Sequence, residues 1–195
     1  MNYIIDYKRT ELKFIGLVLS VFKVMYKSAF IAFIKYTNGS FSYIIASHGM
    51  RVGQLISSFN TFNYNRNMKQ FLYPGSTVLL RLLPRYSIFS NLHLCNSNKA
   101  QYARAGGTYC QLIDKFEDHQ VATIKLPTGS TRIIHLNSYV ILGRNSNIMN
   151  KSITYGKAGY RRKFGCKPIV RGVARNPVDH PNGGRTKTNK PEKSL

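Results

Sequence analysis

Glycine and proline recur throughout the last quarter of the chain, and they constrain its fold more than any other feature. After Arg144 they interrupt every possible helix or strand, at Gly156, Gly159, Gly165, Pro168, Gly172, Pro177, Pro181, Gly183, Gly184 and Pro191. A segment of this kind cannot bury a core and is disordered on its own. The sequence therefore predicts an extended tail over residues 146–195 that a partner holds in place.

The charge of the chain indicates what this partner is. There are 29 Lys and Arg against 7 Asp and Glu, a net charge of +22, and a net +11 of it lies in residues 144–195. Such a surplus, with aromatic residues spread along the chain, favours nucleic acid over a membrane or a small-molecule substrate. The longest charge-free run of the apolar N-terminal stretch, residues 14–22, is also far shorter than the about 20 residues of a membrane-spanning helix.

Short apolar runs separated by turn signals fill the first three quarters of the chain. Asn38-Gly39 and residues 127–129 are typical hairpin turns. The expected strands are residues 29–36, 41–46, 77–83, 108–113, 121–126 and 131–136. Repeated strands of this length predict an all-β fold with two small barrels, over residues 1–85 and 86–145. A helix over residues 12–26, with one apolar face, is the main alternative for the N-terminal stretch.

The residues that carry chemistry in enzymes and metal proteins are scarce. Cys95, Cys110 and Cys166 lie far apart, are odd in number and form no C-x-x-C pair. This pattern argues against a disulfide framework and against a zinc module, so reduced thiols and no metal are expected. Seven acidic residues in the whole chain leave little for a catalytic pocket. We expect neither a cofactor nor an enzymatic activity.

The tail also contains the most specific motifs. Its residues 156–159 read GKAG, residues 168–174 read PIVRGVA, residues 176–181 read NPVDHP, and Gly183-Gly184 follow. Small side chains allow the backbone to approach phosphates, and the flanking Arg and Lys neutralise them. Further motifs lie upstream: IDYKR at residues 5–9, YTNG at 36–39, QYARAGGTYCQL at 101–112 and LPTG at 126–129.

These motifs closely resemble those of the universal large-subunit ribosomal protein L2 family, and the resemblance covers nearly the whole chain. It implies an oligonucleotide-binding-like barrel, an SH3-like barrel and an extended basic tail that passes through large-subunit rRNA towards the peptidyl-transferase region. Neighbouring ribosomal proteins are further expected partners. The chain departs from the family pattern at Lys163, Arg175 and Asn182, where the family has Trp, Met and His. The family's terminal extensions are expected to be missing or shortened.

The resemblance and the basic pattern together predict the RNA-binding residues. They are Arg104, Lys157, Arg161, Arg162, Lys167, Arg171, Arg175, Asn176, His180 and Arg185. For His180 we expect an anchor on RNA rather than a catalyst, because a general acid or base must first reach a reacting proton. Three tyrosines are candidates for stacking on bases: Tyr102, Tyr109 and Tyr160. Because Tyr109 lies within an expected strand, packing in the core is the preferred expectation for this residue.

The composition also bears on the compartment. Asn, Ile, Lys, Tyr and Phe are abundant and Trp is absent, as in the product of a very A+T-rich gene. With no recognisable transit peptide, this bias indicates an organelle-encoded protein of the mitochondrial ribosome; a plastid or a bacterial cytoplasm is the alternative. A free-standing single-strand-binding protein is the alternative function, but it would have its basic residues on the barrel rather than in the tail.

Overall fold

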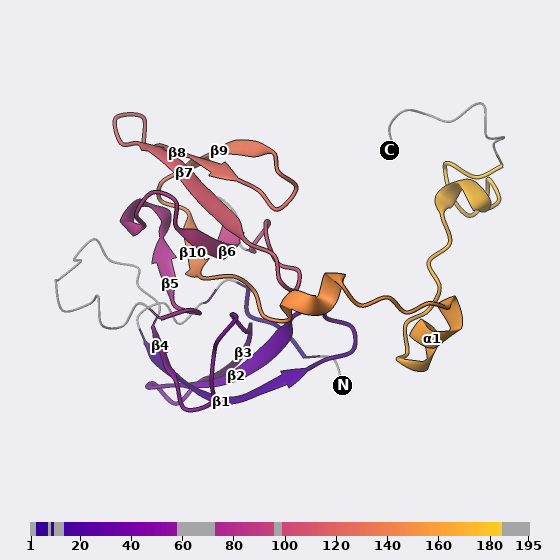
Figure 1. The fold of residues 1–195 in the computed structure, drawn as a ribbon, viewed down its shortest axis with the longest axis horizontal. Coiled ribbons are helices and arrows are strands. Elements are labelled where there is room, and N and C mark those ends of the chain that lie inside the picture. The colour runs from indigo at the N-terminus through magenta and orange to yellow at the C-terminus, as the bar shows by residue number, and fades with distance from the viewer. Residues whose placement is uncertain (1–2, 8, 10–13, 58–72, 96–98, 185–195) are drawn as a thin grey trace. The chain divides into compact units, whose positions relative to one another are not determined.

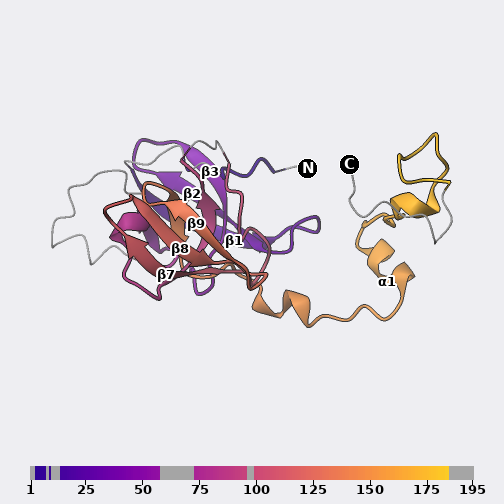
Figure 2. The same ribbon diagram turned by 90° about the horizontal axis from the view of Figure 1, so that it is seen from above.

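The computed structural model describes residues 3–7, 9, 14–57, 73–95 and 99–184, and these form an almost entirely β structure (Figure 1). The chain divides into two compact units, residues 1–154 and residues 155–195. The first unit, here called the body, contains two antiparallel sheets, of which the second lies above the first in Figure 1 and overlaps it in the view from above in Figure 2. The predicted all-β class is confirmed, in agreement with an oligonucleotide-binding-like and an SH3-like barrel.

The first sheet is an antiparallel arrangement with the order β3-β2-β1-β4. Its strands are β1 (Ile15–Lys23), β2 (Phe30–Tyr36), β3 (Phe41–Ile45) and β4 (Leu55–Ser57). The predicted hairpin at Asn38-Gly39 is confirmed, since the Gly39 amide donates to the Tyr36 carbonyl at 2.9 Å and Gly39 has a φ of 84°. The alternative helix is wrong in the part of residues 12–26 that the structure describes, because β1 pairs with both β2 and β4.

The second sheet has six strands in the order β5-β10-β6-β7-β8-β9. They are β5 (Thr77–Leu79), β6 (Ile88–His93), β7 (Cys110–Phe116), β8 (Val121–Lys125), β9 (Thr131–His135) and β10 (Tyr139–Leu142). The predicted pairing across residues 127–129 is confirmed, with Lys125 opposite Thr131. Phe89, Leu112 and Ile124 are among the residues that form the core of this sheet. A separate core, which includes Val18 and Ile34, lies on one face of the first sheet.

Two expected strands differ from the observed ones. Residues 77–83 were expected as one strand of the first barrel, but β5 ends at Leu79 and a 3-10 helix, η2 (Leu80–Leu82), follows it. β5 pairs with β10 in the second sheet, where Val78 packs into that sheet's core. The strand expected at residues 108–113 begins only at Cys110. The apolar pattern identified a buried segment in each case, but it did not specify the pairing partner.

The segment that follows β10 belongs to the body, although the tail was expected from residue 146. Ser146 is buried, and its amide donates to the Ala46 carbonyl at 3.0 Å. The Asn147 side-chain amide donates to the Ser28 carbonyl at 2.6 Å. A 3-10 helix, η3 (Ile148–Lys151), completes this segment. These contacts hold residues 145–151 against the first sheet, and the second unit begins at Tyr155.

The described part of the second unit, residues 155–184, has turns and two short helices and no strand. They are α1 (Ala158–Lys163) and a 3-10 helix, η4 (Gly172–Ala174). No helix was expected here, because glycine and proline recur every few residues. α1 forms between Gly156 and Gly165 and contains Gly159. It ends in a run of Arg and Lys, which are favourable near a helix C-terminus, and Gly165 follows it with a φ of 77°. Among the described residues 155–184, Gly183 is the one residue classed as buried.

Candidate RNA-binding surface

An aromatic cluster stabilises the N-terminal part of the second unit. The rings of Tyr160 and Phe164 meet edge to face with centroids 5.3 Å apart, and Tyr155 lies 6.0 Å from Tyr160. The Arg161 guanidinium lies over the Tyr155 ring at 5.9 Å from its centroid. These contacts between side chains at the surface stabilise the short helix α1. The charged groups of Arg161 and Arg162 stay exposed to solvent.

Residues 171–184 fold back on themselves through local backbone hydrogen bonds. The Asn176 carbonyl accepts from the amides of both Asp179 and His180, at 3.0 and 3.2 Å. The Gly184 amide donates to the Arg175 carbonyl at 3.0 Å, which closes the loop. The motif NPVDHP therefore forms a compact series of turns, here called the tail loop, in which proline restricts the backbone and one carbonyl accepts two amides.

The His180 ring is held inside the tail loop. Its Nδ1 accepts a hydrogen bond from the Asn182 amide at 3.1 Å, so in the neutral ring Nε2 carries the proton. The ring also packs on Gly172, where a Cβ atom would come within 2.5 Å of Nδ1. This geometry agrees with an anchoring residue, because one ring nitrogen already has a partner within the loop.

The tail glycines have two different physical roles. At Gly172 and Gly183 a side chain would collide with the tail loop itself, so these glycines are required by internal packing. At Gly159 nothing lies within 4 Å of the Cβ position, so the backbone is open to a ligand. Internal packing therefore explains Gly172, whereas no contact within the described chain explains Gly159.

The charges of the described tail are not neutralised within it. Residues 155–184 contain seven basic residues and a single acid, Asp179, and no ion pair joins them in this part of the chain. The structure places eight of the predicted site residues on this unit: Lys157, Arg161, Arg162, Lys167, Arg171, Arg175, Asn176 and His180. All of them are exposed except His180, which is partly buried. Arg185 lies outside the described residues.

Arg104 is the predicted site residue that belongs to the body. It is exposed, in the loop before β7, and its guanidinium lies 5.7 Å from the centroid of the Tyr7 ring. Arg9 shows that a basic residue can instead serve the fold. Its side chain is only 1% exposed, its Nη1 donates to the Gly75 carbonyl at 3.2 Å, and burial lowers the pKa of its guanidinium.

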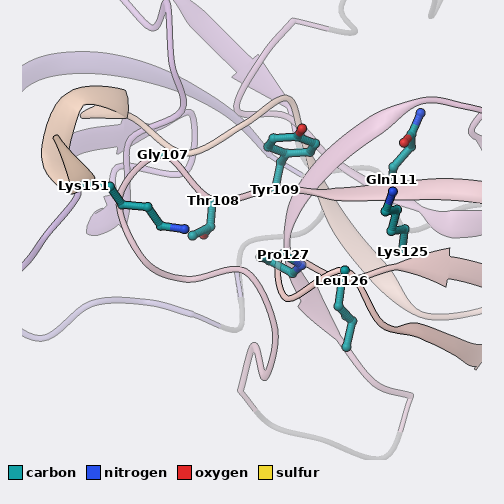
Figure 3. Close-up of a pocket in the computed structure, with 9 residues that line it drawn as sticks. Gly107, Thr108, Tyr109, Gln111, Lys125, Leu126, Pro127 and Lys151 are labelled. Atoms are coloured by element: carbon teal, nitrogen blue, oxygen red, sulfur yellow. The ribbon is translucent and has the colours of Figure 1, made fainter.

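A cleft on the second sheet was not expected from the sequence. It has a volume of about 200 Å³ and is lined by Gly107, Thr108, Tyr109, Gln111, Lys125, Leu126, Pro127, Gly129 and Lys151 (Figure 3). Tyr109 was expected in the core, but it precedes β7 and is 41% exposed. The Arg144 guanidinium lies over its ring, 5.3 Å from the centroid. No sequence motif brings Lys125 and Lys151 together, so only the fold could reveal this site.

Metal sites and membrane-spanning helices are features of other classes of protein. Within the described ranges, no three His, Cys, Asp or Glu side chains gather as they would around a metal ion. In the same residues, no helix is long and apolar enough to cross a membrane. Cys95, Cys110 and Cys166 are free thiols.

Comparison with known proteins identifies the family. The model of the ribosomal protein L2 RNA-binding N-terminal domain matches residues 2–58, and that of the L2 C-terminal domain matches residues 73–195. The chain is 39% identical over 180 residues to the large ribosomal subunit protein uL2 of Orientia tsutsugamushi (strain Ikeda). It is 38% identical over 180 residues to uL2m of Reclinomonas americana.

Both alignments cover 92% of this chain and 62% of the relative. A third relative, uL2 of Ehrlichia ruminantium (strain Gardel), is 37% identical over 184 residues, which are 93% of this chain and again 62% of the relative. The chain therefore spans less than two thirds of the length of the curated relatives it matches. Because the two domain models together match most of its residues, the chain belongs to the ribosomal protein L2 family.

Proposed function

We propose that this chain is a structural constituent of the large ribosomal subunit. It binds large-subunit rRNA, contacts neighbouring ribosomal proteins, and supports assembly and the peptidyl-transferase region during translation. One observation carries this proposal: seven basic side chains are displayed without acidic partners on a tail that has no apolar core. A protein would not retain such self-repulsion without a polyanion to bind. Membership of the ribosomal protein L2 family supports rRNA as this polyanion.

The two units have different tasks in this proposal. Lys157, Arg161, Arg162, Lys167, Arg171, Arg175 and Arg185 neutralise phosphates, and Asn176 and His180 shape the tail loop that enters the RNA. Arg104 makes a phosphate contact from the body. The tail is best drawn from residue 155, because Ser146 and Asn147 are held on the first sheet. Affinity comes mainly from the tail, and the body provides position and shape.

In this proposal the chain is not an enzyme, and substitutions of His180 test whether this residue is an anchor or a catalyst. His180→Gln retains a hydrogen-bonding side chain, whereas His180→Ala removes the ring that packs on Gly172. We therefore expect impaired assembly of the subunit with His180→Ala and a milder defect with His180→Gln. Both effects are measured as the fraction of each variant in complete large subunits. Complete and structurally unaltered His180→Gln subunits that make no peptide bonds would instead demonstrate a catalytic role.

The ribosome to which the chain belongs is proposed to be mitochondrial. The composition of an A+T-rich gene supports this, as does a mitochondrial relative, uL2m, among bacterial ones. Sedimentation of extracts from purified mitochondria and from the remaining cell fraction tests the function and the compartment together. We expect the chain to sediment with large subunits of the organelle. Recovery only in light fractions would favour a free-standing single-strand-binding protein and would contradict the proposal.

A further inference from the structure

The cleft on the second sheet is formed by three segments that lie far apart in the sequence. They are residues 107–109 before β7, the turn 126–129 between β8 and β9, and Lys151 at the end of η3 (Figure 3). Its volume of about 200 Å³ is several times the roughly 30 Å³ that one water molecule occupies in the liquid. The cleft is therefore large enough for chemical groups of a ligand and is not merely a hydration site.

One wall of the cleft is fixed before any ligand binds. The Gly107 amide donates to the Ser146 carbonyl at 2.9 Å, and the Gly107 carbonyl accepts from Arg144 Nη2 at 3.1 Å. Gly107 has a φ of 70°, and a Cβ at this position would lie 2.9 Å from the Cα of Ile148. Only glycine fits here. Its close contact with η3 holds this helix, and with it Lys151, against residues 107–109, which precede β7. A fixed wall lowers the entropy that binding must overcome.

The lining of the cleft is chemically suited to an RNA strand. Lys125 and Lys151 are its two charged residues, both are exposed, and no acidic residue lines the cleft. Lys151 extends toward Thr108, while Lys125 rises from β8 beside Gln111 (Figure 3). Tyr109 adds an exposed aromatic ring, and the Arg144 guanidinium lies over it. Two cations beside an aromatic ring form the combination that single-stranded RNA uses: phosphate neutralisation together with base stacking.

We propose that this cleft binds consecutive nucleotides of an RNA strand. Lys125 and Lys151 each neutralise one phosphate, and the Tyr109 ring stacks on a base. This inference rests on the proposed function, and it adds an RNA site on the body that is separate from the tail. It also accounts for the exposure of Tyr109, a large aromatic side chain that would otherwise be left in water.

The experiment compares the full-length chain with Lys125→Gln/Lys151→Gln in titrations of a large-subunit rRNA transcript over a salt series. Loss of two phosphate contacts should flatten the log–log salt slope by about 1.4 to 1.8, since each phosphate contributes about 0.7 to 0.9. At 0.1 M salt this corresponds to roughly 25- to 60-fold weaker binding if the contacts act by counterion release. Arg85→Gln/Lys99→Gln removes the same charge from exposed positions outside the cleft and should leave slope and affinity nearly unchanged, because Arg85 is already paired with Asp114.

Tyr109 gives an independent readout. Ultraviolet cross-linking followed by mass spectrometry should identify a nucleotide attached to Tyr109, and the cross-link should disappear in Lys125→Gln/Lys151→Gln. Adenosine monophosphate and inorganic phosphate, added alone, distinguish a strand site from a small-ligand site. We expect neither to compete with RNA at concentrations near the protein's. Tight binding of either one, dependent on both lysines, would overturn the assignment to a strand.

The possible failures are distinguishable. If the unaltered chain does not bind the rRNA transcript, the proposed function fails and the cleft assignment fails with it. If the unaltered chain binds but Lys125→Gln/Lys151→Gln has the same slope as Arg85→Gln/Lys99→Gln, the cleft assignment alone is wrong. Circular dichroism melting of each variant shows whether the fold is intact, and the exposure of all four residues predicts that it is.

Discussion

The body and the tail carry a similar surplus of positive charge but are held together in different ways. Residues 1–154 contain 18 basic and 5 acidic residues, a net charge of +13, and residues 155–195 contain 11 basic and 2 acidic residues, a net charge of +9, although the tail is much the shorter. The body contains two apolar cores. The tail loop is held by local hydrogen bonds, and apolar side chains such as Val178, 90% exposed, stay in water. The body therefore buries its apolar side chains within its own fold, whereas the described part of the tail leaves apolar side chains such as Val178 exposed.

The two regions also use their basic residues differently. In the body, Arg85 pairs with Asp114 at 3.0 Å, and Lys115 donates to the Arg81 carbonyl at 2.6 Å. Burial lowers the pKa of Lys115, which shows that part of the charge of the body is bound up in its fold. In the described part of the tail, no basic side chain has such an ionic partner. Because the fold of the body already uses some of its basic groups, net charge alone overstates the RNA-binding capacity of the body relative to that of the tail.

The largest expected effect is that of removing the tail. If about eight of its basic groups meet phosphates, deletion of residues 155–195 should flatten the log–log salt slope of rRNA binding by about six units. The truncated chain should retain weaker and less salt-sensitive binding through the body. Titrations of both chains over a salt series measure this. Equal slopes for the two would mean that the tail is a solvated appendage and that the difference between the regions has no consequence for affinity.

The second expected effect concerns stability, to which the body contributes more than the tail. Phe89 is 0% exposed in the core of the second sheet, so Phe89→Ala should lower the free energy of unfolding by about 3–5 kcal/mol. Val178→Ala removes an exposed side chain and should change it by less than about 0.5 kcal/mol. Urea denaturation measures both. A loss of several kcal/mol from Val178→Ala would show that the tail has a core of its own.

The sequence predicted the parts of the fold that short-range signals determine. The hairpins at Asn38-Gly39 and at residues 127–129 were found because turn residues and flanking apolar runs lie within a few positions of each other. The position of β5 could not be found in this way, since it depends on pairing with β10, about sixty residues further along the chain. β6 and β10 were also missed, although Gly143 follows β10, because the two strands pair with each other across about fifty residues of sequence.

The same distinction between local and non-local information applies to the site. The tail residues were identified from motifs and charge density, which are properties of a continuous segment. Helix α1 was not predicted, because glycine and proline recur throughout the tail and disfavour helices and strands. The six residues from Ala158 to Lys163 are nevertheless enough for one short helix. The cleft was missed for the opposite reason, since Lys125, Lys151 and Tyr109 meet only after three separate segments have folded together.

The third expected effect separates the two kinds of tail glycine. Gly172→Ala places a methyl group against the His180 ring, and overpacking of this kind costs about 1–3 kcal/mol. The tail loop should therefore rearrange even without RNA, and the backbone amide signals of Asn182 and Gly183 should shift in NMR spectra. Gly159→Ala meets nothing within 4 Å, so it should leave the RNA-free spectrum of the tail loop unchanged and weaken only RNA binding. Identical spectra for the two variants would remove this distinction.

Hydrogen exchange of the RNA-free chain tests whether the tail loop is ordered before it binds. Because the loop has no apolar core, we expect its amides to exchange much faster than those of β7 and β8. Strong protection throughout residues 170–178, equal to that of the strands, would contradict the view that the tail needs its partner. The strands provide the internal reference, since their amides are paired within a packed sheet.

The smallest expected effect is a pH dependence that arises from a buried thiol in the core of the second sheet. Cys110 is 0% exposed, and burial raises the pKa of its thiol to about 12. In the unfolded chain the thiol loses its proton near its ordinary pKa, about 9, so the folded state binds more protons between these two values. The stabilisation that results is fully present below pH 9 and is lost as the pH rises from about 9 towards 12. At pH 10 the loss amounts to about 1.4 kcal/mol.

Urea denaturation at pH 7 and pH 10 should show that Cys110→Ala has a smaller decrease in stability between the two pH values than the unaltered chain. Cys166→Ala, which changes a tail thiol outside either core, should keep the full decrease. An equal decrease in all three proteins would mean that the buried thiol does not contribute to the pH dependence of the body.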